Sequence, residues 1–123
     1  MKKDYLLYGS LAKKLYENTA KDLPVIDYHN HLDAGVIREN VCFENITKLW
    51  ISTDPYKHRA MRILGVEEKY ITGDGSDYEK FCKWYECLPL LSGNVLYHWS
   101  DMELDRFFGI DLTSEFDNGT TSQ

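Results

Sequence analysis

The stretch that decides the fold is residues 24–31, which read Pro-Val-Ile-Asp-Tyr-His-Asn-His. A leading proline, two β-branched residues and polar residues at the carboxyl end are typical of a short β-strand, which we predict over residues 24–29. In an extended strand, residues i and i+2 point to the same face, so the imidazoles of His29 and His31 can converge on one point. The stretch therefore predicts a strand that ends in two candidate metal ligands.

The pattern alone leaves two interpretations of the histidine pair open. Imidazole is the commonest neutral metal ligand in proteins, and Asp27, two residues before His29, could orient it. The alternative is two unrelated polar residues in a loop. Two ligands cannot complete a four-coordinate site, and the remaining histidines, His58 and His98, lie on predicted helices without an obvious route to the pair.

The residues after position 33 predict helices. Asp54 and Pro55 form an N-cap and first-turn pair that opens a helix ending at Gly65. Ser76 and Glu79 form a capping box that opens the next helix. The sequence therefore predicts a helical chain behind the strand.

Three further boundaries follow from the same rules. Pro89 ends the helix that starts at Ser76, and Ser100 with Glu103 predicts another capping box, whose helix stops at Gly109. An amphipathic helix is predicted over residues 11–20. Residues 111–123 read as a polar, flexible tail.

One strand followed only by helices is an unusual domain. A lone strand leaves its backbone donors and acceptors unpaired, which is costly when they are buried. The strand therefore needs partners that this chain does not contain, and self-association is one way to cover it. We expect the chain to be a fragment of a larger fold.

Composition excludes several classes of protein. The chain has 123 residues, of which 43% are hydrophobic, enough for one compact domain. Its net charge of -6, without a stripe of Lys and Arg, argues against nucleic acid as a partner. No apolar run approaches the roughly 18 residues needed to cross a membrane, and three dispersed cysteines do not form a disulfide framework. We expect a cytoplasmic protein.

The residues around the histidine pair resemble the uronate isomerase family of the amidohydrolase superfamily. The similar segments occur in one order and include uncommon strings such as Tyr-Ile-Thr-Gly-Asp-Gly-Ser-Asp, which is far more specific than the histidine pair alone. They are residues 22–32, 43–50, 54–62, 65–66, 70–77, 79–81, 93–99 and 107–110.

The resemblance implies an α/β fold, the amino-terminal fragment of a (β/α)₈ TIM barrel in which a helical insertion follows the first strand. Residues 1–110 would be that strand and insertion, so this chain itself is expected to be mostly α-helical. The family isomerises D-glucuronate to D-fructuronate and D-galacturonate to D-tagaturonate. His29 and His31 would be ligands of a divalent metal ion, which we expect to be Zn²⁺. The partner is thus a small uronic acid.

By the same resemblance, Tyr56 lies next to the substrate and assists proton transfer at oxygen. A phenol is protonated at neutral pH and can donate a proton, although a tyrosine in the first turn of a helix can equally serve packing. The family usually has Asp-His-Tyr-Lys-Trp where this chain has Asp-Pro-Tyr-Lys-His, so Pro55 replaces a histidine that contacts substrate. His58, three residues on, is a weak candidate to take its place.

Two alternatives accompany the isomerase hypothesis. One is a metal-dependent hydrolase of the same superfamily, in which the metal ion activates a water molecule. The other is a truncated, catalytically inactive paralogue that serves as a helical binding or scaffold module. A complete barrel takes about 250 residues. We therefore expect the 123-residue chain alone to be inactive.

Overall fold

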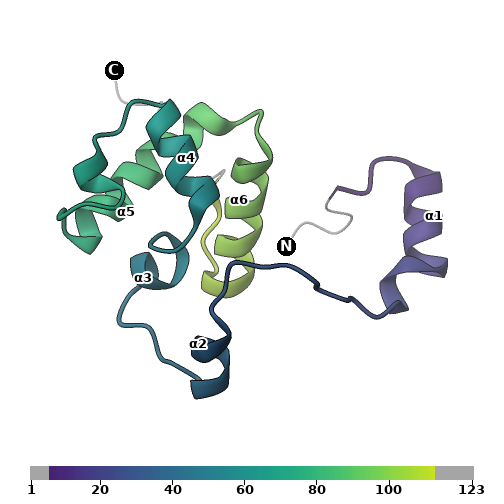
Figure 1. The fold of residues 1–123 in the computed structure, drawn as a ribbon. Coiled ribbons are helices and arrows are strands. Elements are labelled where there is room, and N and C mark those ends of the chain that lie inside the picture. The colour runs from purple at the N-terminus through teal and green to yellow at the C-terminus, as the bar shows by residue number, and fades with distance from the viewer. Residues whose placement is uncertain (1–5, 113–123) are drawn as a thin grey trace. The chain divides into compact units, whose positions relative to one another are not determined.

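The computed structural model describes residues 6–112, which belong to two compact units, Met1–Asn30 and His31–Gln123. Each unit is described by itself. Both are helical, as Figure 1 shows, and residues 6–112 contain no β-strand. The prediction that the chain is mostly α-helical is confirmed.

The first unit contains one α-helix and one short turn. Helix α1 (Ser10–Asn18) is followed by the 3₁₀ turn η1 (Ala20–Asp22), in agreement with the helix predicted over residues 11–20. Leu11 and Leu15, four residues apart on one face of α1, are 68% and 58% exposed. The unit therefore leaves an apolar helix face open.

The strand predicted over residues 24–29 is wrong for this structure. Val25 and Tyr28 are 92% and 96% exposed, and the segment has neither helical nor strand hydrogen bonds. A strand is defined by pairing with a neighbour, and residues 6–112 provide none. Instead, the Asp27 carboxylate accepts the backbone N–H of His29 and the side-chain amide of Asn30, both at 3.2 Å. Local hydrogen bonding of this kind is typical of aspartate in turns.

The second unit is built from short helices joined by tight turns. Trp84 is fully buried in a hydrophobic core that also contains Ile51, Met61, Leu88 and Leu104. The elements are α2 (Ala34–Glu39), α3 (Ile46–Trp50), α4 (Pro55–Ile63), η2 (Glu68–Tyr70), α5 (Asp77–Cys87), η3 (Leu88–Leu91) and α6 (Val95–Phe108).

Local sequence signals explain most helix ends of this unit. Ser76 and Glu79 form the predicted capping box at the start of α5, which ends two residues before Pro89. Gly65 (φ 81°) and Gly109 (φ 69°) follow α4 and α6 in the left-handed conformation that favours glycine. These predictions are confirmed.

The capping box predicted at Ser100 and Glu103 is wrong. The N-cap of α6 lies six residues earlier, at Asn94, whose side chain accepts the backbone N–H of Leu96 at 2.9 Å and so caps the first turn. Ser100 lies inside the helix and is buried. A serine followed by a glutamate three residues later is thus not sufficient to locate a helix start.

The predicted polar tail, residues 111–123, lies mainly outside the described residues. Of the described part, Leu112 is fully buried and belongs to the hydrophobic core. The second unit therefore uses chain at least to Leu112. No helix within residues 6–112 has the length and apolar character to span a membrane.

Candidate functional site

The structure brings two of the predicted site residues, His31 and Tyr56, into contact. The imidazole of His31 meets the ring of Tyr56 edge-on, with centroids 5.6 Å apart and planes inclined by 77°. His31 precedes α2 and Tyr56 lies in the first turn of α4, so the contact joins positions 25 residues apart in sequence. Both side chains are exposed, with Tyr56 44% accessible. A ligand can therefore reach both rings.

The turn that carries Tyr56 is fixed by Asp54. The Asp54 carboxylate accepts the backbone N–H groups of Tyr56 at 2.9 Å and Lys57 at 3.1 Å, and Pro55 occupies the first helical position, where a missing N–H costs nothing. Burial raises the pKa of Asp54, but its hydrogen bond to Lys57 and the positive charge of that residue hold the pKa below its ordinary value. The carboxylate is thus kept in the ionised form that caps the helix.

Lys57 is a buried cation of α4. Its side chain is only 6% exposed, and its ammonium lies 2.6 Å from Asp54 and 3.9 Å from Glu103. The same ammonium sits over the rings of Trp50 at 4.8 Å and Trp84 at 5.9 Å, a cation–π arrangement. Lys57 therefore ties α4 to α3, α5 and α6. The three-residue spacing of Asp54 and Lys57 can be read from the sequence. The proximity of Trp84 and Glu103 to Lys57 cannot, because both residues are distant from it in the sequence.

His58 faces the core and not the side of α4 that carries Tyr56. Residues two apart on an α-helix point about 200° from each other, and His58 is 8% exposed. Within the described residues its Nε2 atom is buried without a hydrogen-bond partner. Burial lowers the pKa of His58, against a hydrogen bond with the Ile51 backbone that raises it. Substrate contact by His58 stays a prediction, and the structure places the ring where such contact would require rearrangement.

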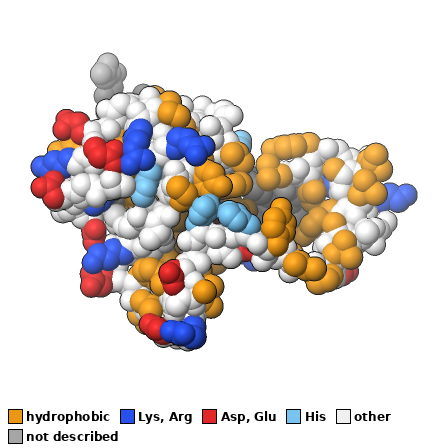
Figure 2. Space-filling view, in the orientation of Figure 1, with side chains coloured by type: hydrophobic (Ala, Val, Ile, Leu, Met, Phe, Trp, Pro, Cys, Tyr) orange, Lys and Arg blue, Asp and Glu red, His pale blue; other side chains and the backbone are white. Residues whose placement is uncertain are grey.

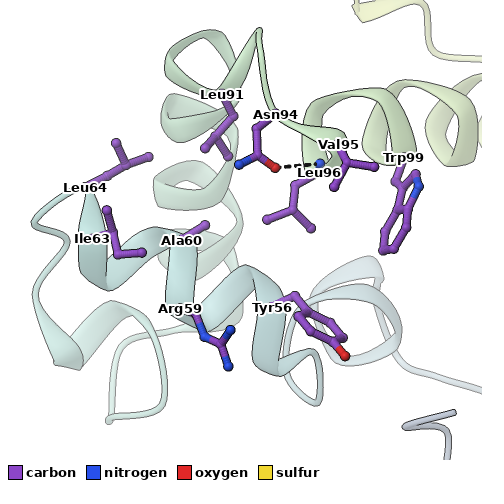
Figure 3. Close-up of a pocket in the computed structure, with 10 residues that line it drawn as sticks. All are labelled: Tyr56, Arg59, Ala60, Ile63, Leu64, Leu91, Asn94, Val95, Leu96 and Trp99. Carbon is purple, nitrogen blue, oxygen red and sulfur yellow. Dashed lines mark hydrogen bonds between the residues drawn. The ribbon is translucent and has the colours of Figure 1, made fainter. Parts of the chain in front are cut away.

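A pocket of about 420 Å³ opens between α4 and α6, as Figure 3 shows. Apolar side chains of α4, η3 and α6 line most of it, and Arg59 is the one charged residue in its wall. Tyr56 also lines it. The lining residues are Tyr56, Arg59, Ala60, Ile63, Leu64, Leu91, Asn94, Val95, Leu96 and Trp99.

The two metal-ligand candidates fall at the boundary of the two units. His29 is the second-last residue of the first unit, where its backbone N–H donates to the Asp27 carboxylate, and His31 is the first residue of the second unit. Their imidazoles have the right chemistry for Zn²⁺, but they supply only two of four ligands, and residues 6–112 contain no group of three or more His, Cys, Asp or Glu that could hold a metal ion. The described residues thus fit part of a metal site. Convergence of the two rings stays a prediction.

The family model for glucuronate isomerase matches residues 1–121 of this chain. The chain belongs to the glucuronate (uronate) isomerase family. Over 111 residues it is 53% identical to the uronate isomerase of Caldicellulosiruptor bescii, a match that covers 90% of this chain and 24% of the relative. Over 121 residues it is 50% identical to that of Brachyspira hyodysenteriae, covering 98% of this chain and 26% of the relative.

The fold of the chain is also similar to that of a solved uronate isomerase structure. The crystal structure of uronate isomerase from Thermotoga maritima matches with a TM-score of 0.79 at 41% sequence identity, over 89% of this chain and 24% of that chain. The chain therefore spans about a quarter of the length of the relatives that it matches.

Proposed function

We propose that this chain supplies part of the active site of a uronate isomerase. The observation that carries the proposal is the match of the glucuronate isomerase family over residues 1–121. The reaction is the aldose–ketose isomerisation of D-glucuronate to D-fructuronate, and of D-galacturonate to D-tagaturonate. Because the chain spans only a quarter of its relatives, the activity belongs to a longer polypeptide, and the 123-residue chain alone is expected to be inactive.

The proposed chemistry moves a proton between adjacent carbons of the sugar acid through an enediol-like intermediate. His29 and His31 would hold a divalent metal ion, which we propose is Zn²⁺ and which would stabilise the negative charge that develops on the substrate oxygens. Tyr56 would donate and recover a proton at one of those oxygens. Its contact with His31 supports this role, because it brings the proton donor next to a proposed ligand.

The proposed setting is a (β/α)₈ barrel. Residues 24–29 would then become its first strand, because neighbouring strands would pair the backbone groups that are exposed here. The second unit would form the helical insertion that follows. The proposed strand and insertion are consistent with the order of the chain, in which residues 24–31 end in polar residues and are followed by a run of helices.

Pro55 favours a second candidate, an inactive paralogue. The family usually has a substrate-contacting histidine at this position, and a proline side chain can neither donate nor accept a hydrogen bond. In the structure Pro55 suits the first turn of α4 well, so its presence is explained by helix geometry without any catalytic role.

The test is a hybrid enzyme: the Caldicellulosiruptor bescii uronate isomerase with its matching 111 residues replaced by those of this chain. We expect the hybrid enzyme to convert D-glucuronate. Tyr56→Phe should lower kcat by about 10²–10⁴-fold, the usual range for a lost general acid. Tyr78→Phe, at a tyrosine on α5 outside the pocket, should leave kcat unchanged.

Three results would contradict the proposal or redirect it. A folded hybrid enzyme without turnover that gains it on Pro55→His identifies the inactive paralogue. Turnover of ester or amide substrates in place of uronates identifies the hydrolase. Equal kcat for Tyr56→Phe and the unsubstituted hybrid enzyme removes Tyr56 from the mechanism.

A further inference from the structure

We propose that the pocket between α4 and α6 is a docking surface for an apolar segment, bearing a carboxylate, from the remaining three quarters of a uronate isomerase chain. The proposal rests on the proposed function, because it takes the partner from the isomerase polypeptide. It assigns a role to a surface that the chemistry described above does not use, apart from Tyr56 at its edge.

The wall of the pocket is apolar and open to solvent. Ile63 is 77% exposed, Val95 54% and Trp99 46%, and all three line the same hollow. Figure 2 shows hydrophobic side chains gathered between α4 and α6 of the second unit, with Lys and Arg side chains over α4 beside them. A contiguous apolar surface of this kind marks an interaction site more often than free surface.

Arg59 gives the surface a charge preference. It is the one ionised residue in the wall, and no carboxylate within residues 6–112 pairs with it; its described contact is with the Tyr56 ring, 6.0 Å from the guanidinium. Arg62, one turn on, is by contrast satisfied by both Glu68 oxygens, at 2.8 and 2.6 Å. A guanidinium beside apolar walls favours a planar carboxylate, with which it can form two hydrogen bonds.

The length of the relatives identifies the occupant. The fold described here is 24% of the Thermotoga maritima chain, so three quarters of that polypeptide has no counterpart in this chain. A second copy of this chain is a poorer partner, since a two-fold contact through this surface would bring Arg59 against its own symmetry mate. The rest of an isomerase chain can present a carboxylate there.

Cysteine labelling tests the docking directly. In a background with the two accessible cysteines changed (Cys42→Ser, Cys82→Ser), Ile63→Cys is labelled with a soluble maleimide in the 123-residue chain and in the hybrid enzyme. We expect labelling roughly tenfold slower or more in the hybrid enzyme, because a covered site reacts only on local opening. Asp74→Cys, at an exposed polar residue in the turn before α5, should react equally in both.

A second pair of variants tests the charge. Arg59→Gln should lower the Tm of the hybrid enzyme and leave that of the 123-residue chain unchanged, because the proposed carboxylate is present only in the former. Arg106→Gln, at an exposed arginine on α6 outside the pocket, should change neither Tm.

Each result decides between the alternatives. Equal labelling of Ile63→Cys in both proteins, including in a hybrid enzyme that does not fold, overturns the proposal. Protection that grows with the concentration of the 123-residue chain identifies a second copy as the occupant and also overturns it. Protection of Ile63→Cys in a hybrid enzyme without turnover supports the docking proposal and contradicts the isomerase proposal. Turnover without protection supports the isomerase proposal and contradicts the docking proposal.

Discussion

At the scale of single residues, Lys57 links the turn that carries Tyr56 to the core. A buried ammonium is costly unless it is paired, and here Asp54 and the faces of two tryptophans compensate it. Sequence reasoning found the cap, because Asp54 and Pro55 are adjacent. It did not predict the cation cage, by which we mean the groups of Asp54, Glu103, Trp50 and Trp84 around the Lys57 ammonium. Glu103 lies 46 residues after Lys57, and only tertiary packing brings the two together.

Lys57→Ala should lower the free energy of unfolding of the 123-residue chain by about 2–4 kcal/mol, because it leaves Asp54 partly buried without its cation. Urea denaturation followed by tryptophan fluorescence measures the change. The matched control is Lys48→Ala, which removes an exposed ion pair with Glu44 and should have little effect. Equal losses in the two variants would show that the cage does not stabilise the fold.

His58 makes stability depend on pH. Its pKa is lowered in the folded chain, so the unfolded chain binds the proton more readily as the pH falls below about 6.5, the ordinary histidine value. We expect the free energy of unfolding to decrease between pH 7.5 and 5.5, and His58→Gln to reduce that decrease. His98→Gln, on α6, is the control, and an unchanged pH dependence in His58→Gln would contradict the account.

At the scale of the elements, local chemistry predicts helix boundaries where the capping residues are themselves sufficient. This holds for Asp54, for Ser76 with Glu79, and for Gly109. It fails at Ser100, because Asn94 caps the helix at an earlier position and Ser100 is buried inside the helix. It also fails for residues 24–29, because a strand depends on partners that local sequence does not supply.

The capping box of α5 gives a quantitative prediction. Ser76→Ala removes the hydroxyl that accepts the Glu79 N–H at 3.3 Å, and should lower the free energy of unfolding by about 1 kcal/mol. Ser92→Ala, at an exposed serine that caps no α-helix, should change it little. A thermal or urea melt of both variants makes the comparison, and equal stability would mean that the box is not needed.

At the scale of the whole molecule, the chain contains two candidate metal ligands and one candidate proton donor of the proposed isomerase site. His31 and Tyr56 meet within the second unit, and their residue types and the surrounding motifs were readable from the sequence. Their contact was not, because it depends on how α4 folds back on the segment before α2. Residues 6–112 contain no group of three or more His, Cys, Asp or Glu that could hold a metal ion, so the proposed metal site would need further ligands.

The 123-residue chain should therefore show no turnover of D-glucuronate, with or without added Zn²⁺, since two histidines cannot complete a catalytic metal site. A coupled assay for the ketose product, run on chain purified away from host isomerase, makes the measurement. Turnover by the purified chain would show that a quarter of the family's length is enough.

The measurement that tests the central claim most directly is the zinc content and D-glucuronate turnover of the hybrid enzyme, determined on one sample. We predict that the unsubstituted hybrid enzyme and His98→Ala bind zinc and turn over, whereas His29→Ala and His31→Ala lose most of both. Full zinc content and full turnover after replacement of His29 and His31 together would contradict the assignment of these two residues as the ligands this chain contributes.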